Sequence, residues 1–184
     1  IWDRFAHTPG TIEDGSNGDI ACDHYHRWED DLDLVAGAGF DVYRFSTSWA
    51  RVLPEGRGTP NAEGLDFYDR LVDGMLGRGL KPAATLYHWE LPSPLADLGG
   101  WRNREVADWF ADYTQLVVDR LSDRVSHWFT LNEPQVYIDH GHSAGNHAPR
   151  MKYDRSCLLR VIHPSLLAHG RSVQVIRDRA VLTP

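Results

Sequence analysis

Three apolar runs recur at regular intervals along the chain. Residues 42–49, 83–89 and 125–134 are rich in aromatic, β-branched and leucine side chains, a composition typical of buried strands. Each run ends in polar or charged groups, and comparable positions in the three runs are equally spaced. Each interval is long enough for a strand, a helix and their loops. The pattern therefore predicts successive βα units and a parallel α/β fold.

Between these runs, apolar residues return at helical spacing. Gly39 follows the first such stripe, Gly77 and Gly79 end the second, and Asn103 is expected to cap the third, which runs to about Ser122. The stripes are expected to face the core. Their apolar positions are Trp28, Leu32 and Val35 in the first, Tyr68, Leu71, Val72, Met75 and Leu76 in the second, and Val106, Trp109, Phe110, Tyr113, Leu116 and Val117 in the third.

The remaining segments predict loops and two irregularities. Residues 1–23, which are rich in Gly, Asp, Ser and Asn, and the stretch between Pro134 and Pro149 are expected to be loops. Pro164 lacks a backbone donor, so it is expected to disturb a helix around residues 156–169. Residues 178–184 pass from a helix to a strand-like fragment with almost no connecting loop, which is unusually tight.

The third apolar run ends in an amide, a carboxylate and a proline. Pro134 ends the strand because proline cannot donate a hydrogen bond to a neighbouring strand, so Asn132 and Glu133 are expected at its carboxyl-terminal lip. In parallel α/β folds this lip is where substrates are bound and chemistry is done. A helix cap or a rim ion pair explains a single glutamate there equally well.

The other two runs place an arginine and a histidine in similar settings. Arg44 lies within an apolar strand, where a guanidinium is expected to be buried and to need a carboxylate partner, whether for catalysis or as a structural ion pair. His88 and Trp89 follow the second run. A neutral imidazole both donates and accepts hydrogen bonds, and an indole offers an apolar face with one donor.

Composition narrows the possible partners. The net charge is −7 and no run of Lys or Arg forms a basic stripe, so nucleic acid is not an expected partner. Neither a signal peptide nor an apolar span of membrane length is visible, so we expect no membrane partner and a cytoplasmic location, although the chain starts with Ile1 rather than Met. Cys22 and Cys157 lie far apart and are expected to be ordinary thiols.

Histidine spacing does not predict a metal site. His24 and His26 form a close pair, but no Glu or third His accompanies them at a spacing typical of zinc sites. A metal-dependent hydrolase would need three converging ligands at strand ends, and only His88 is placed in this way. We therefore expect neither a metal nor a cofactor.

Five short motifs together resemble glycoside hydrolase family 1, the β-glucosidase family. They are residues 43–46 with Trp49, residues 64–69, residues 85–89, residues 99–101 and residues 130–134. The resemblance runs from Ile1 to about Val175. It implies a (β/α)8 barrel, of which this chain would be the portion from just after the first strand to about the fifth. A complete barrel typically needs about 250 residues, so the 184 residues are expected to form a single incomplete domain, residues 1–184.

The resemblance also implies a role for each candidate residue. Glu133 is similar to the family's acid/base, and Arg44 to the arginine that orients the nucleophilic glutamate and keeps it ionised. That nucleophile lies on a later strand, beyond this chain. His88 resembles the family histidine that hydrogen-bonds a sugar hydroxyl, and Trp89 resembles the residue that forms the adjoining wall of the sugar site. Asn132 resembles the residue whose amide binds the 2-hydroxyl. Arg150 and Pro164 depart from the family pattern, which usually has Gly and Asn at these positions.

The expected function is therefore that of part of a retaining β-glycosidase. Its substrates would be β-linked glucosides or related glycosides and oligosaccharides, and its partner the missing carboxyl-terminal half of the barrel. This chain alone would be inactive because it lacks the nucleophile. Two alternatives remain: one chain of a split glycosidase, or a carbohydrate-binding pseudoenzyme. The pseudoenzyme would keep His88, Trp89 and Asn132 but would not need Glu133.

Overall fold

The computed structural model describes residues 1–182 and contains one parallel three-stranded sheet. Its strands are β1 (Val42–Ser46), β2 (Lys81–Tyr87) and β3 (His127–Leu131), which lie side by side in that order. Arg44 is paired in register with Ala83, and Thr85 with Phe129. Because the strands are parallel, their carboxyl ends meet at one edge of the sheet. The predicted succession of βα units is confirmed.

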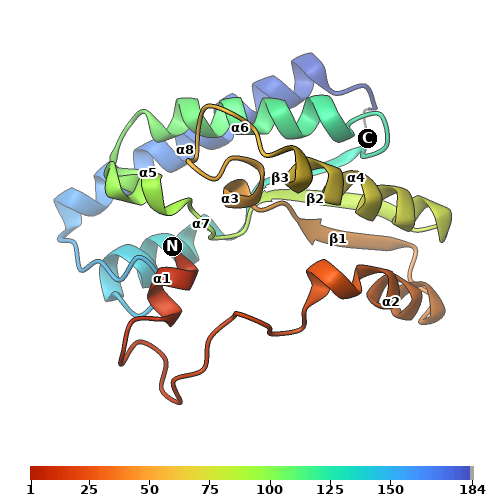
Figure 1. Cartoon of the computed structure of the whole chain (residues 1–184). Helices are drawn as coiled ribbons and strands as arrows, with labels where there is room; N and C mark the ends of the chain where they lie inside the picture. The colour runs from red at the N-terminus through yellow and green to blue at the C-terminus, as the bar shows by residue number, and fades with distance from the viewer. Residues whose placement is uncertain (183–184) are drawn as a thin grey trace.

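Helices connect the strands and cover one face of the sheet. Figure 1 shows α4, α6 and α8 on that face, while α1, α5 and α7 lie beyond the carboxyl ends of the strands. The helices are α1 (Trp2–Ala6), α2 (His24–Gly37), α3 (Trp49–Val52), α4 (Ala62–Gly77), α5 (Ser93–Asp97), α6 (Val106–Leu121), α7 (Pro134–Ile138) and α8 (Arg155–Arg179), with a 3-10 turn η1 (Gly100–Arg102) and a π-helical segment η2 (Asp139–Ala144).

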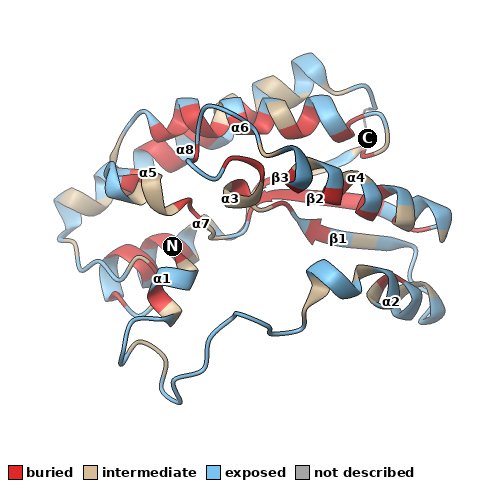
Figure 2. Ribbon diagram, viewed as in Figure 1, coloured by how far each residue is buried: buried red, intermediate tan, exposed pale blue. Residues whose placement is uncertain are grey.

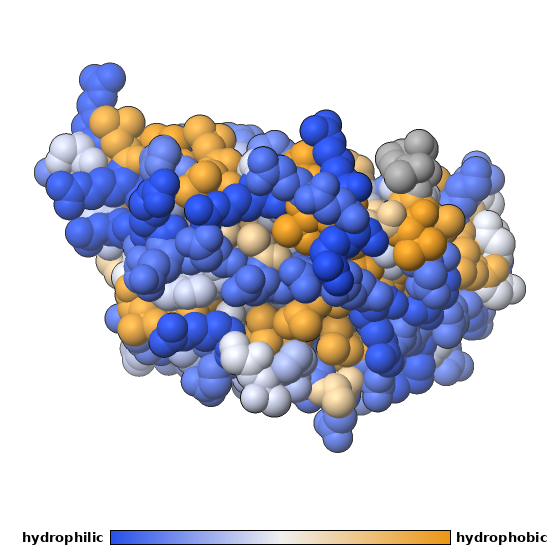
Figure 3. Space-filling view, turned by 90° about the horizontal axis from the view of Figure 1, so that it is seen from above, coloured by the Kyte–Doolittle hydropathy of each residue, from blue (hydrophilic) through white to orange (hydrophobic). Residues whose placement is uncertain are grey.

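The core lies between the sheet and the helices that cover it. Figure 2 shows the buried residues concentrated on β2 and on the inner sides of α6 and α8. Seen from above, the outer side is largely hydrophilic, with hydrophobic side chains in separate patches (Figure 3). Within residues 1–182, none of the helices combines the length and the apolar character that a membrane crossing requires.

An aromatic cluster fixes the carboxyl end of β2. The ring of Trp49 stacks on that of Tyr113 with centroids 5.3 Å apart, and Phe110 packs against both. The hydroxyl of Tyr113 donates to the carbonyl of Leu86 at 3.0 Å, and the indole of Trp101 donates to the Tyr87 hydroxyl, also at 3.0 Å. The buried polar atoms of these rings are therefore paired, and they hold the last residues of β2 in place.

The strands are shorter than the apolar runs predicted. Pairing ends at Ser46, Tyr87 and Leu131, so the predicted ends at Trp49, Trp89 and Pro134 were wrong by a few residues. Trp49 begins α3 and Pro134 begins α7. Aromatic composition does not distinguish the end of a strand from the first turn of a buried helix, because both face the core.

Two predicted loops contain helices, and the cap of one helix was predicted at the wrong residue. Residues 1–23 include α1, and the stretch from Pro134 to Pro149 contains α7 and η2. The carboxamide oxygen of Asn103 accepts from the amide of Glu105 at 3.0 Å, which closes a turn before α6. Glu105 is the residue at the cap position of that helix. Short helices of this kind depend on tertiary packing and have weak sequence signals.

Neither irregularity expected near the carboxyl terminus has the predicted form. Pro164 lies inside α8, and the helix continues through it without a break. The hydroxyls of Thr114 and Ser172 are 2.9 Å apart and link α6 to α8. Residues 180–182 form no strand; the amide of Leu182 instead donates to the carbonyl of Ser122 at 2.9 Å. The last two residues of the predicted strand-like fragment, 183–184, lie outside the described residues.

The burial of Phe110 gives a first prediction. Replacing Phe110, which is fully buried among aromatic rings, with Ala should lower the free energy of unfolding by about 3–5 kcal/mol because it leaves a cavity in the core. Phe40→Ala is the matched control: Phe40 is 63% exposed, and its loss should change the free energy by less than about 0.5 kcal/mol. Urea unfolding followed by fluorescence measures both; equal losses would show that this cluster is not the core.

Candidate active site

The predicted site residues meet at the carboxyl edge of the sheet. Arg44 projects from β1, His88 and Trp89 directly follow β2, and Asn132 and Glu133 directly follow β3. Hydrogen bonds and electrostatic contacts join them. The side of the sheet that carries them is the one not covered by α4, α6 and α8 (Figure 1).

Arg44 links the three strands through uncharged partners. Its Nε donates to the hydroxyl of Thr85 at 2.9 Å and its Nη2 to the carboxamide oxygen of Asn132 at 2.8 Å. The guanidinium carbon lies 4.6 Å from the centre of the Phe129 ring, a cation–π contact. The expectation of a buried arginine was wrong: Arg44 is exposed, because no element among residues 1–182 covers this face, and none of their carboxylates pairs with it.

Asn132 connects the other residues of the site to one another. Its backbone amide donates to the carbonyl of Tyr87 at 2.9 Å, and its own carbonyl accepts from the indole of Trp89 at 2.8 Å. The side chain is buried, with its oxygen held by Arg44 and its NH2 group 3.4 Å from a carboxylate oxygen of Glu133. The orientation of the amide is therefore fixed, and the NH2 group faces the carboxylate.

Trp89 and Glu133 have strained backbones at equivalent positions. Their φ angles are 76° and 40°, in the left-handed region that residues with a side chain seldom adopt. Such strain costs about 1–3 kcal/mol per residue and persists only where the surroundings enforce it, often at functional sites. Here the indole is tied to Asn132, and Glu133 immediately precedes α7. The strained positions therefore coincide with two of the predicted site residues.

His88 is held next to two charged groups. Its Nδ1 lies 3.1 Å from the hydroxyl of Ser46. Partial burial lowers the pKa of His88, the positive charge of Arg44 lowers it further, and the negative charge of Glu133 acts in the opposite direction. The neutral imidazole is therefore favoured near pH 7, the form that both donates and accepts hydrogen bonds.

Several residues that support the site were not predicted from the sequence. Ser46, Thr85 and Phe129 position His88 and Arg44. The available signal was the period of two along a strand, which places Ser46 on the same side of β1 as Arg44. The indole of Trp2, in the amino-terminal helix, also donates to the carbonyl of Trp89 at 3.2 Å, a contact that no sequence pattern indicates.

The structure offers no metal cluster in the part that it describes. No three His, Cys, Asp or Glu side chains among residues 1–182 are arranged to hold an ion. The His24 and His26 rings instead contact the neighbouring carboxylates of Asp31 and Asp23, at 2.5 Å and 2.6 Å. Glu90, which follows Trp89, accepts a hydrogen bond from the backbone nitrogen of Ile1 at 2.7 Å.

The sequence matches the protein-family model of glycosyl hydrolase family 1 over residues 1–183. The chain belongs to this family. It is 49% identical over 178 residues to Beta-glucosidase A of Thermotoga maritima, an alignment that covers 97% of this chain and 40% of that protein. Beta-glucosidase A of Acetivibrio thermocellus is 51% identical over 178 residues, and this alignment also covers 97% of this chain and 40% of that protein. The chain thus spans about 40% of the length of these relatives.

Solved structures of the family agree with the observed fold. The family 1 β-glucosidase from Thermotoga maritima superimposes with a TM-score of 0.96 at 48% identity, covering 99% of this chain and 41% of that structure. The same enzyme in complex with deoxynojirimycin also gives a TM-score of 0.96 at 48% identity, covering 99% of this chain and 42% of that structure. The three strands and their helices are therefore part of a (β/α)8 barrel, as the resemblance implied. The roles of Glu133, Arg44, His88, Trp89 and Asn132 stay predictions.

The charges around His88 give a second prediction. Arg44→Met should raise the pKa of His88, because a nearby positive charge disfavours the imidazolium, and Glu133→Gln should lower it further. Imidazole NMR signals recorded over a pH series measure both shifts. Arg70→Met, which removes an exposed arginine on α4, is the control and should leave His88 unchanged. Shifts in the same direction for both site variants would contradict the proposed geometry.

Proposed function

We propose that the chain is part of a retaining β-glycosidase that hydrolyses β-linked glucosides or related glycosides, with Glu133 as the acid/base. One observation carries the proposal: in a family 1 chain, Glu133 follows β3 in a strained turn beside an Asn132 amide that Arg44 holds in place. Relatives named β-glucosidases, and a solved relative that binds deoxynojirimycin, support the same substrate class.

Retaining hydrolysis needs two carboxylates about 5–5.5 Å apart. In the proposed mechanism Glu133 donates its proton to the glycosidic oxygen while the nucleophile attacks the anomeric carbon, so the aglycone leaves and a glycosyl ester forms. Glu133 then accepts a proton from the water that attacks this ester, which releases the sugar with retained configuration. We infer from the resemblance to the family that the nucleophile lies on a later strand, outside this chain.

Arg44 is suited to orient that nucleophile. Its Nε and Nη2 are bound to Thr85 and Asn132, while its Nη1 makes no hydrogen bond to the residues described. A carboxylate that reached this exposed side would meet a guanidinium already fixed in direction. The positive charge would keep the carboxylate ionised, as a nucleophile requires. Arg44 is thus a positioning residue in this proposal.

The remaining residues are placed to bind the sugar. The Asn132 carboxamide oxygen is occupied by Arg44, so its NH2 group is the part that would donate to the 2-hydroxyl, a contact that strengthens in the transition state. Neutral His88 would bind another hydroxyl, and the Trp89 ring would form the adjoining wall. If the nucleophile lies outside this chain, as we infer, the chain alone does not turn over substrate and needs the rest of the barrel.

A carbohydrate-binding pseudoenzyme explains fewer of these observations. It would use His88, Trp89 and Asn132 in the same way. It would have no use for a strained Glu133 whose carboxylate lies 3.4 Å from the Asn132 amide, since the left-handed backbone there lowers stability. The hydrolase therefore remains the function that these features support best.

The decisive experiment replaces Glu133 with Ala in a single-chain hybrid, in which the parts of Thermotoga maritima β-glucosidase A that this chain does not span are fused before and after it in their natural order. Loss of an acid/base typically slows turnover about 10²–10⁴-fold. With a substrate whose leaving group needs no protonation, the glycosyl-enzyme should still form and its hydrolysis should stall. Azide needs no base, so it should restore turnover and give the β-glycosyl azide.

Glu90→Ala is the matched control for this test, because Glu90 also follows a strand but has no assigned catalytic role. It should need no azide for turnover. An α-glycosyl azide from Glu133→Ala, or a stable glycosyl-enzyme that azide does not release, would assign the acid/base role to another carboxylate.

His88→Ala in the same hybrid tests the sugar contact. Its loss should leave a hydroxyl unpaired in the complex and reduce transition-state binding by about 1–3 kcal/mol, measured as kcat/KM. A substrate deoxygenated at the contacted position should be affected much less. Equal losses for both substrates would show that His88 does not contact the sugar directly.

A further inference from the structure

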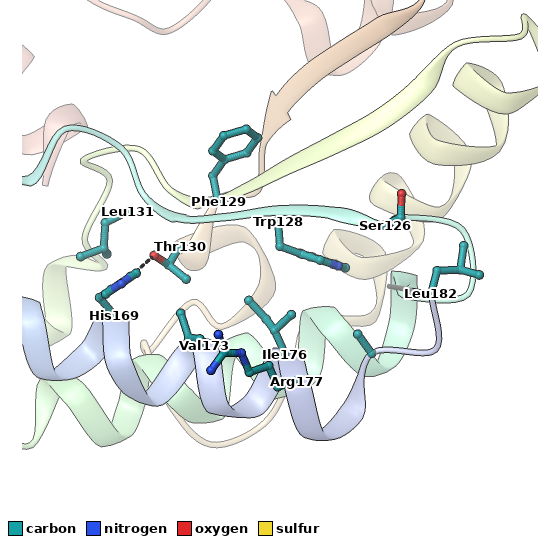
Figure 4. Close-up of a pocket in the computed structure, with 11 residues that line it drawn as sticks. Ser126, Trp128, Phe129, Thr130, Leu131, His169, Val173, Ile176, Arg177 and Leu182 are labelled. Atoms are coloured by element: carbon teal, nitrogen blue, oxygen red, sulfur yellow. Dashed lines mark hydrogen bonds between the residues drawn. The ribbon is translucent and has the colours of Figure 1, made fainter. Parts of the chain in front are cut away.

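An apolar groove of about 500 Å³ lies between β3 and α8. Figure 4 shows Trp128 and Leu131 on the strand side and Val173 and Ile176 on the helix side. Within residues 1–182, β3 pairs with β2 on one side only. In a (β/α)8 barrel every strand has a neighbour on both sides. The groove is therefore the place of the next barrel strand and belongs to the fold already described.

A different feature lies beside the candidate site, where the ring of His147 packs between α1 and the turn after β2. Its centroid is 5.5 Å from that of Trp2 and 6.0 Å from that of Trp89, distances typical of packed aromatic pairs. The same ring stacks on His140, with centroids 4.8 Å apart. Its Nδ1 is buried and has no hydrogen-bond partner among the described residues. Ring packing, rather than a bond to this nitrogen, therefore orients the imidazole.

We propose that His147 is a positioning residue for Trp89, the wall of the proposed sugar site, and that it acts as an uncharged ring stacked on His140. It touches neither the sugar nor the reacting atoms and acts through Trp89. The effect on sugar binding rests on the proposed function. The support of the Trp89 ring does not depend on it.

Trp89 needs support because its backbone is strained. Its φ angle of 76° persists only where the surroundings enforce it. Two hydrogen bonds fix single atoms: the indole nitrogen donates to the carbonyl of Asn132 at 2.8 Å, and the Trp89 carbonyl accepts from the indole of Trp2 at 3.2 Å. The ring itself packs against His88, 5.1 Å away, and against His147. His88 is the proposed sugar ligand, so His147 is the ring that is free to support the wall.

The segment that carries His147 folds back on itself. The amides of Asn146 and His147 both donate to the carbonyl of His140, at 3.0 Å and 3.1 Å. The Nδ1 of His140 also lies 3.0 Å from the carboxamide oxygen of Asn146. At Gly141 an added Cβ would lie 2.6 Å from the carbonyl oxygen of Ala148, so a side chain there would displace the segment. The ring of His147 is thus in place before a sugar binds, as a positioning role requires.

An uncharged His147 fits these surroundings. The imidazolium has a hydrogen on both nitrogens, and a buried N–H at Nδ1 would lack an acceptor. Burial lowers the pKa of His147, and a positive charge on His140 lowers it further. Trp2 and Trp89, on the other two elements packed against the ring, are uncharged, and the described ion pairs between histidines and carboxylates include neither His140 nor His147. The support is therefore present while the imidazole is neutral and is lost as the pH falls through the lowered pKa.

Replacements of His147 in the single-chain hybrid test this role. In His147→Ala the indole N–H of Trp89 should exchange with solvent at least about fivefold faster, measured by NMR, because the ring above it is gone. At about pH 7 the KM for an aryl β-glucoside should rise about three- to tenfold and kcat should change less than about twofold, because the wall binds substrate and transition state alike. His147→Phe restores a ring and should return both values to within about twofold of the unmodified hybrid.

Acid supplies a readout that a merely structural ring would not change. Between about pH 7 and about pH 5.5, the KM of the unmodified hybrid divided by that of His147→Phe should rise at least about threefold. Glu133 titrates in both proteins, so this ratio isolates His147. His26→Ala is the matched control: it removes a 73% exposed imidazole on α2 and should change exchange and KM less than about twofold. Circular dichroism checks that each variant is folded.

Each part of the proposal has an outcome that overturns it. Unchanged exchange of the Trp89 indole in His147→Ala would refute the positioning role, whether or not the hybrid is active. A KM ratio that stays constant or falls in acid would refute the uncharged role, and a fall would show that the indole faces hold an imidazolium. An inactive hybrid with faster indole exchange would contradict only the proposed function, whereas normal turnover with unchanged exchange would contradict only the role of His147.

Discussion

The structure depends on the pairing of β2 on both sides. From Pro82 to Tyr87 this strand is buried, and it fixes the register of β1 and β3. Its pairing continues past the strand ends, where the carbonyls of Thr85 and Tyr87 accept from the amides of Thr47 and Asn132. Side chains alternate along a strand, so a slip of one residue would turn Arg44 from the open face toward the helices. The site geometry thus follows from the register of one buried strand.

Most of the fold was predictable because its signals are local and periodic. The strands, the helices with long apolar stripes, and the carboxyl-edge positions of Arg44, His88 and Asn132 follow from spacing and from residues such as Pro134 that end a run. The features that were not predicted depend on tertiary contacts. Trp49 begins a helix because its ring enters the aromatic cluster, and the left-handed turns at Trp89 and Glu133 are enforced by neighbours far apart in sequence.

The sequence predicted which residues lie together at the carboxyl edge of the sheet, but not the contacts that hold them there. The carboxylate expected beside Arg44 was the nucleophile outside this chain, so that pairing stays a prediction. Within residues 1–182, Arg44 is held by the Thr85 hydroxyl, the Asn132 amide and the face of Phe129. These partners fix its direction without neutralising its charge. In the proposed mechanism that arrangement is useful, because an incoming carboxylate meets a cation already oriented, and little reorganisation is needed when charge develops.

The open edge and the open face of the sheet belong to the same strand. β3 delivers Asn132 and Glu133 at its end, presents Phe129, 45% exposed, on the site side, and lines the groove with Trp128 on the other. A strand added beside β3 would therefore cover the groove and begin to enclose the site together. Enclosure removes water from around Arg44 and Glu133 and strengthens their electrostatic effects, since charges interact more strongly in a medium of lower dielectric constant. On this argument, covering the edge of β3 and enclosing the site are one structural event.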